Sequence, residues 1–192
     1  MADIQEINRI LKDHQETIAA TFAIAEEIGK AADMVAESLA NGGTIMLCGN
    51  GGSAADAQHI AGEFVSRFFM ERRALPSLAL HTNTTVMTAI GNDYSFDVVY
   101  SRQVEAHGKQ GDVLIAITTS GTSPNILRAA EKAREMGIKV IGWTGNKQSP
   151  FPALCDLCLQ VPSPVTPRVQ EMHILIGHII CELAEKQLCG PK

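Results

Sequence analysis

The sequence predicts an α/β protein, a three-layer α-β-α sandwich built on a parallel five-stranded sheet. Short apolar segments alternate with helical patterns between residues 44 and 161, which is typical of βαβ units. The length of 192 residues fits one domain, at roughly 100–200 residues per domain. With 45% hydrophobic and 19% charged residues, the composition argues against disordered, collagen-like and coiled-coil classes.

Two amphipathic helices are expected before the first strand. Apolar residues recur at helical spacing and the pattern stops at Asn41-Gly42-Gly43. The recurring residues are Ile4, Ile7, Ile10, Leu11, Ile18, Phe22, Ile28, Met34, Val35 and Leu39. We therefore interpret residues 1–192 as a single domain, in which 1–42 form an N-terminal helical extension and 43–192 the α/β core with a C-terminal helix.

The five strands are expected at residues 44–48, 77–80, 113–117, 139–143 and 157–161. Helical patterns separate most of them, so a parallel sheet covered by helices on both faces follows. The last helix is expected from Pro167 to about Leu188, and the length of its apolar side indicates burial against partners.

Charge and hydropathy exclude two classes of partner. Lys and Arg number 16 against 21 Asp and Glu, a formal charge of -5, without a basic tail or stripe for a phosphate backbone. No apolar run approaches the roughly 18 residues of a membrane helix, and the first residues lack the order of a signal peptide. We expect no nucleic acid, no membrane partner and a cytoplasmic location.

The five cysteines do not predict a disulfide framework, because their number is odd and no export signal precedes them. Cys155 and Cys158 form a CxxC within a segment, 155–161, that resembles a strand. Residues three apart on a strand point to opposite faces, so we expect buried structural thiols rather than a metal clamp.

A glycine-rich turn follows the first strand in Cys48-Gly49-Asn50-Gly51-Gly52-Ser53-Ala54. Glycines let backbone amides approach an anion, and the following helix adds its dipole, so this turn is a candidate sugar-phosphate cradle. The alternative is a plain tight turn. A dinucleotide fingerprint fits poorly, because the second strand ends in His81-Thr82-Asn83 without a ribose-binding acid.

The third strand runs into Thr118-Thr119-Ser120-Gly121-Thr122-Ser123-Pro124, a loop rich in hydroxyl groups. Ser123 stands as N-cap and Pro124 at the first helical position. The loop lacks a Walker lysine, so it favours a monophosphate on a small molecule over a nucleoside triphosphate. The alternative is a helix cap that carries more hydroxyl groups than capping requires.

Two helices carry candidate ligands. His59 and Glu63 stand at i and i+4, the geometry of two metal ligands, of an acid and a base, or of a solvated helix-face contact. In the last helix, Gln170 and His178 lie about 12 Å apart along the axis, and His178 with Glu182 forms a competing pair. Each histidine could also be a partly buried imidazole with a structural partner. The spacing of the residues does not distinguish between these pairings.

These segments together resemble the phosphoheptose isomerases, a branch of the sugar isomerase (SIS) domain superfamily. The resemblance rests on residues 48–64, Gly91-Asn92-Asp93, residues 118–123 and Arg168-Val169-Gln170-Glu171 with His173 and His178. It implies a SIS fold, a homotetramer, and isomerisation of sedoheptulose 7-phosphate to D-glycero-D-manno-heptose 7-phosphate, the entry step to bacterial surface heptose such as that of lipopolysaccharide. It also implies one Zn²⁺ per subunit, held by His59, Glu63, Gln170 and His178.

Roles follow from this resemblance and from the chemistry of an enediol. We expect Glu63 to move the carbon-bound proton and His178 to serve the oxygens. The phosphate is expected on Thr118, Thr119, Ser120 and Ser123, and the sugar on Asn50, Gly51, Gly52, Ser53, Glu63, Asn92, Asp93 and Gln170.

One departure from the family pattern concerns the sugar, and two other functions stay open. Thr166-Pro167 precedes Arg168 where some members of the family place an Asp, so the resemblance does not carry that carboxylate contact to the sugar hydroxyls over to this chain. A non-enzymatic SIS adaptor that binds the replication initiator, or a sugar-phosphate sensor, would share both loops. Neither would need a converging acid, base and ligand set.

Overall fold

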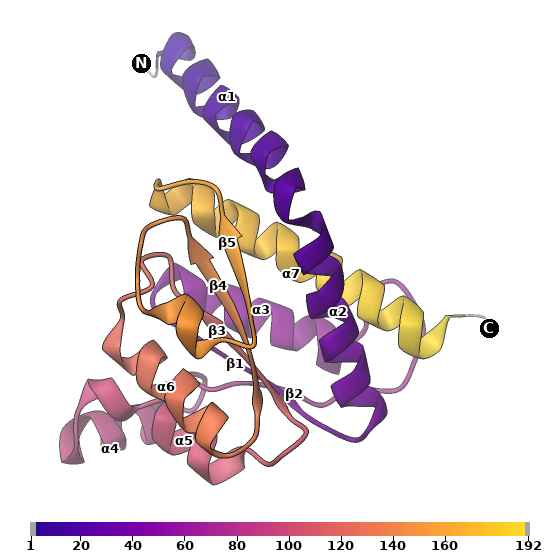
Figure 1. Cartoon of the computed structure of the whole chain (residues 1–192), viewed down its shortest axis with the longest axis vertical. Helices are drawn as coiled ribbons and strands as arrows, with labels where there is room; N and C mark the ends of the chain where they lie inside the picture. Colours follow the sequence, from indigo (N-terminus) through magenta and orange to yellow (C-terminus); the bar gives the residue numbers. More distant parts are fainter. Residues whose placement is uncertain (1–2, 191–192) are drawn as a thin grey trace.

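The computed structural model describes residues 3–190, which form a central parallel sheet between two layers of helices (Figure 1). The strand order is β2-β1-β3-β4-β5. All five strands are confirmed close to their expected bounds: β1 Ile45–Gly49, β2 Ser77–Ala79, β3 Val113–Ile117, β4 Lys139–Gly145 and β5 Leu157–Val161. Each strand pairs in parallel with its neighbours, in the register Ile45↔Val113 and Val113↔Lys139.

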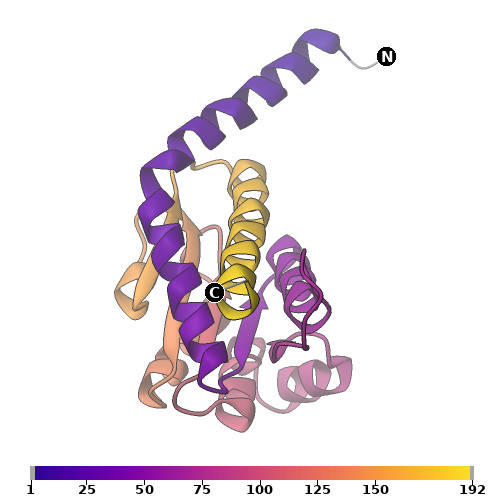
Figure 2. The same cartoon turned by 90° about the vertical axis from the view of Figure 1, so that its right-hand side faces the viewer.

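The two expected N-terminal helices are α1 (Ile4–Thr21) and α2 (Ala25–Ala40), joined by a short 3₁₀ turn at Phe22–Ile24. In both views α1 projects away from the sheet as an arm, while α2 lies against the body (Figures 1 and 2). The other helices are α3 Gly52–Val65, α4 Thr84–Asp93, α5 Ser101–His107, α6 Pro124–Glu135 and α7 Thr166–Cys189.

The alternation of side chains along the strands divides the core into two. Ile45 and Leu47 of β1 face α2, α3 and α7, whereas Met46 and Cys48 of the same strand face α5 and α6. Burial on both faces explains why the central strands read as continuous apolar runs. Within residues 3–190, no helix combines the length and hydropathy needed to cross a lipid bilayer.

The strand order reverses between β1 and β3, because the chain leaves β1 toward β2 on one side and continues from β3 toward β5 on the other. The carboxyl ends of two such strands leave a crevice at the switch point, where open α/β sheets bind ligands. Both loops singled out in the sequence, after Gly49 and after Ile117, start at this crevice.

The prediction of free cysteines is confirmed, but the predicted arrangement of Cys155 and Cys158 is wrong. All five cysteines lie in the described residues and are free thiols, but Cys155 precedes β5 and follows a 3₁₀ turn, Phe151–Leu154. The Cys155 thiol donates to Phe151 O at 3.3 Å, and both cysteines are half-buried against the same hydrophobic cluster. Their interaction raises the pKa of Cys155 and lowers that of Cys158. The expectation that the two side chains point to opposite faces is therefore wrong.

Gly177 lets α7 approach α3 closely. A Cβ on Gly177 would stand 2.6 Å from Ile60 Cδ1 and 3.1 Å from a ring carbon of Trp143. Ile60 and Trp143 are fully buried, so neither side chain has free space to move into. The absence of a side chain at position 177 thus sets the spacing of the two helices.

We expect Gly177→Ala to destabilise the protein by about 1–3 kcal/mol through overpacking, although alanine is the better helix former. Gly29→Ala is the matched control, because a Cβ at Gly29 of α2 meets open space. It should stabilise by up to about 1 kcal/mol. Urea unfolding of both variants checks this; equal stabilisation by both substitutions would show that helix spacing does not depend on Gly177.

Candidate functional site

The loop between β1 and α3 turns sharply at Gly51, whose φ of +57° is a conformation that side chains disfavour. Gly51 occupies the N-cap position of α3 without a side-chain cap, and Ser53 lies buried in the first turn. The helix N-terminus therefore faces the crevice with its positive dipole end uncapped by a protein side chain.

The hydroxyl-rich loop brings a second helix N-terminus to the same crevice. Ser123 occupies the N-cap position of α6, as expected, but its hydroxyl makes no cap hydrogen bond; instead Thr118 Oγ1 lies 3.3 Å from Ser123 Oγ. Ser120 Oγ accepts hydrogen bonds from the backbone and hydroxyl of Thr122, which leaves its own hydroxyl proton free to donate. Ser120 therefore stays a predicted phosphate contact beside Thr118 and Ser123.

A small cavity of about 60 Å³ joins the two loops. Its lining is polar apart from Ile117, and consists of Asn50, Ser53, Ile117, Thr118, Thr119, Ser123 and Gln170. Hydroxyl groups and two helix N-termini around one small space are suited to an anion such as a phosphate. Six residues predicted from the sequence as substrate contacts thus come together.

Asn125, which the sequence analysis missed, holds the cavity residue Asn50 in place. Its amide and that of Asn50 donate to each other, with N···O distances of 2.9 and 2.8 Å, and Asn125 is buried. This reciprocal pair ties the loop after β1 to the first turn of α6. No local pattern could reveal it, because the partners are 75 residues apart.

Gln170 links the cavity to α7. Its side chain lies over Gly52, where a Cβ would stand 2.6 Å from Gln170 Nε2. A side chain at position 52 would therefore displace the Gln170 amide. The structure does not bring Gln170 to His178, which is eight residues and about 12 Å farther along the helix. Its role as a fourth metal ligand stays a prediction.

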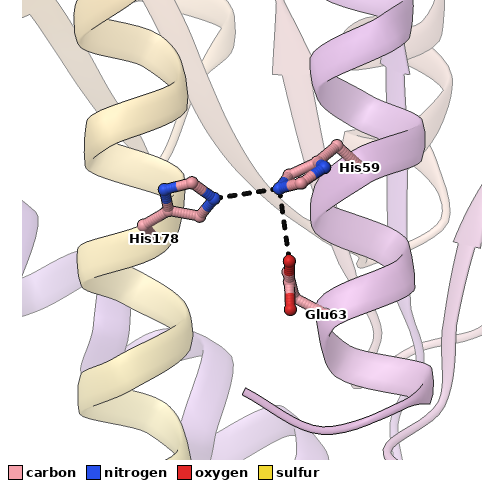
Figure 3. A group of neighbouring side chains, drawn as sticks. All are labelled: His59, Glu63 and His178. Atoms are coloured by element: carbon pink, nitrogen blue, oxygen red, sulfur yellow. Dashed lines mark hydrogen bonds and ion pairs between the residues drawn. The ribbon is translucent and has the colours of Figure 1, made fainter. Parts of the chain in front are cut away.

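The second half of the site is a cluster of His59, Glu63 and His178 (Figure 3). His59 and Glu63 extend from α3 and His178 reaches them from α7. His59 Nε2 lies 3.0 Å from His178 Nε2 and 3.2 Å from Glu63 Oε1, and the three ligand atoms all lie within 4.8 Å of one another. Tertiary packing has joined residues 119 positions apart.

The donor set fits a divalent metal of the zinc type. Two imidazoles and a carboxylate are preferred Zn²⁺ ligands, and three of them leave one tetrahedral position, for the predicted ligand Gln170 or for substrate. Ligand atoms at bond lengths of about 2.0–2.1 Å around a tetrahedral ion stand about 3.3 Å from each other. The separations of 3.0 and 3.2 Å are close to this value without any rearrangement of the helices.

The competing pair proposed for α7 does not form. Glu182 accepts a hydrogen bond from Lys186 at 2.5 Å, so it is engaged one turn away from the cluster. His173 is also excluded from the site, since it is fully buried next to Trp143, and burial lowers the pKa of His173 to about 4. Its imidazole is a neutral part of the core at pH 7.

Asp56 is a second residue that the sequence analysis did not single out. It lies one turn before His59 on α3, and burial raises the pKa of its carboxyl to about 6, although the nearby His59 acts in the opposite direction. Oδ2 of Asp56 has no hydrogen-bond partner among residues 3–190. Burial beside His59 therefore disfavours the ionised form of the Asp56 carboxyl.

The cluster opens onto a broad hollow of about 590 Å³. All of its lining residues come from α3 and the two positions after it: Ala55, Gln58, His59, Gly62, Glu63, Ser66 and Arg67. One wall of the hollow is thus present in this chain. Asn92 and Asp93, at the end of α4, are exposed and hydrogen-bonded to each other, and line neither the hollow nor the cavity.

Comparison with known proteins agrees with this geometry. The family model for the SIS domain matches residues 4–145. The chain is 55% identical to the phosphoheptose isomerase of Rhodospirillum rubrum over 86% of this chain and 88% of that protein. It is 49% identical to that of Burkholderia pseudomallei, over 98% and 97%.

A solved structure leads to the same family. The structure of a phosphoheptose isomerase from Francisella tularensis is 36% identical and covers 97% of this chain and 100% of that one, with a TM-score of 0.93. Identity at this level over whole chains extends beyond a shared fold. The chain belongs to the phosphoheptose isomerases, within the SIS domain family.

Proposed function

We propose that this protein isomerises sedoheptulose 7-phosphate to D-glycero-D-manno-heptose 7-phosphate, with one Zn²⁺ per subunit. The observation that carries the proposal is the convergence of His59, Glu63 and His178 on the same pair of helices that borders the hydroxyl-lined cavity. Membership of the phosphoheptose isomerase family supports the substrate. An adaptor or a sensor would use the cavity but has no need of the cluster.

In this proposal the cavity binds the phosphate and the His59, Glu63 and His178 cluster acts on the reacting carbons. The phosphate binds in the cavity, on Thr118, Thr119 and Ser123, where hydroxyl and amide donors meet. Ser53 and His59 are six residues apart on α3, about 9 Å along its axis. A sugar anchored at its phosphate end extends along this helix and places C1 and C2 at the cluster, so remote binding energy orients the reacting carbons.

The chemistry is a proton transfer between C1 and C2 through an enediol. Glu63 takes the proton from carbon with its carboxylate, and His178 on the facing helix exchanges protons with the carbonyl and hydroxyl oxygens. His59 Nε2 lies between the two, 3.0 Å from His178 Nε2 and 3.2 Å from Glu63 Oε1. His59, Glu63 and His178, with Gln170 as the predicted fourth ligand, would hold a Zn²⁺ ion, which would supply a Lewis acid.

Assembly as a homotetramer in the cytoplasm is part of the proposal. The α1 arm and the 3₁₀ turn after it expose large apolar side chains, with Ile4 65%, Leu11 58% and Phe22 76% exposed, and such patches are typical of subunit contacts. The hollow beside Glu63 has one wall in this chain, so a second subunit would close it and exclude water. The exposed Asn92 and Asp93 remain predicted sugar contacts in that assembly.

Glu63→Gln tests the proposed base. The amide keeps the size of the side chain but accepts no proton, so kcat should fall by about 10²–10⁴-fold while the affinity for the sugar phosphate is retained. Glu182→Gln is the matched control on α7, since Glu182 pairs with Lys186 and should leave turnover unchanged. Near-native kcat in Glu63→Gln would remove Glu63 from the mechanism.

Ser123→Ala tests the phosphate position. Removing a hydroxyl that faces the cavity should raise KM about tenfold, because a hydrogen bond to a charged group is lost, and should change kcat little. Thr122→Ala is the control, as Thr122 is exposed and outside the cavity lining. Steady-state kinetics of the two variants, Ser123→Ala and Thr122→Ala, check this prediction. An unchanged KM in Ser123→Ala would place the phosphate elsewhere.

A further inference from the structure

A buried ion pair lies close to the catalytic cluster, between Arg72 and Glu185. Their side chains are 3% and 2% exposed, and Arg72 Nε lies 2.8 Å from Glu185 Oε1. Glu185 is seven residues after His178 on α7, so the two side chains leave the helix within about 20° of the same direction. The pair therefore lies on the face of α7 that meets α3.

Glu185 organises the chain that follows α3. Its carboxylate accepts hydrogen bonds from the backbone N–H groups of Phe68, Phe69 and Met70, at 2.9, 2.7 and 2.9 Å. Burial alone would raise the pKa of Glu185, but these donors and Arg72 outweigh it and hold the pKa below its usual value. The carboxylate is thus a fixed anchor for three consecutive residues.

Arg72 closes the end of α3. Its guanidinium donates to the carbonyl oxygens of Glu63, Phe64 and Ser66, at 2.9, 2.9 and 3.2 Å. The last carbonyls of a helix have no partners within the helix, and α3 has no basic residue of its own in its last turn. Arg72 supplies both the donors and the positive charge, and one of its contacts is the backbone of Glu63 itself.

Phe68 carries the link on to His178. Its backbone is held by Glu185, and its ring lies 5.6 Å from the imidazole of His178, centroid to centroid, with the ring planes inclined at 32°. Hydrogen bonds of the pair therefore reach the backbone of Glu63, and a ring contact through Phe68 reaches the imidazole of His178. No hydrogen bond of the pair touches substrate-facing atoms, so its action on the site is indirect.

We infer that the Arg72–Glu185 pair positions Glu63 relative to His178, and so sets the geometry of the proton-transfer and metal-binding cluster. The inference rests on the proposed function for its kinetic consequence, but not for its geometric one. Positions displaced by about 1 Å from productive geometry lose on the order of 10²-fold in rate. Glu185 and Arg72 are positioning residues in this account, not catalytic ones.

Glu185→Gln is the test, with Asp112→Asn as a matched control. Asp112 is also a buried carboxylate, which accepts from Thr44 N, Lys109 N and Lys109 Nζ, but it lies directly before the central strand β3 and its hydrogen bonds go to neither α3 nor α7. Both variants should lower Tm. Only Glu185→Gln should lower kcat, by about tenfold to a hundredfold, with a smaller change in KM.

Zinc affinity provides a readout that does not depend on turnover. Competition with a chromophoric chelator should show weaker Zn²⁺ binding by Glu185→Gln and unchanged binding by Asp112→Asn. A folded Glu185→Gln with wild-type kcat and zinc affinity would overturn the inference, as would an equal loss of both in Asp112→Asn. Wild-type protein without turnover would contradict the proposed function alone, because the affinities still compare the two variants.

Arg72→Lys keeps the test decisive if Glu185→Gln fails to fold. Lysine preserves the charge opposite Glu185, but a single ammonium cannot reach the three carbonyls that the guanidinium serves. This variant should fold, retain its KM and lose kcat and zinc affinity. Full activity and affinity in Arg72→Lys would show that charge pairing suffices and that the carbonyl contacts do not position Glu63.

Discussion

The close packing of α7 against α3 is the constraint on which the site depends. His59 and Glu63 are neighbours by helical spacing alone, but His178 joins them only because Gly177 lets the two helices approach at Ile60. The same two helices carry Gln170 and Ser53 to the cavity at the switch point of the sheet. Anion binding and acid-base chemistry are therefore positioned by one helix pair.

The polar groups of this helix pair change in kind from one end of the pair to the other. Hydroxyls and helix N-termini gather at one end, the imidazoles and the carboxylate are half-exposed in the middle, and a fully bonded ion pair closes the other end. A buried ion pair is weak evidence for stability, because its desolvation offsets its attraction. Its value here lies in a fixed geometry, since Glu185 and Arg72 bind backbone groups of the segment that ends α3.

The sequence predicted what depends on local pattern. Periodicity located β3 at 113–117 and β5 at 157–161, and helical spacing paired His59 with Glu63. It could not choose the partner of His178, nor find Asn125, Arg72 or Glu185, because those contacts join residues 75 to 119 positions apart. The CxxC expectation failed for a local reason, because Cys155 ends the 3₁₀ turn Phe151–Leu154 and precedes β5 instead of lying within it.

The most direct test of the account is the conversion of sedoheptulose 7-phosphate to the aldose by protein stripped with a chelator and then restored with stoichiometric Zn²⁺. If His59, Glu63 and His178 form a metal-dependent isomerase site, turnover should disappear on stripping and return with the metal. Turnover that is indifferent to metal would contradict the metal site. No turnover under either condition would contradict the isomerase itself.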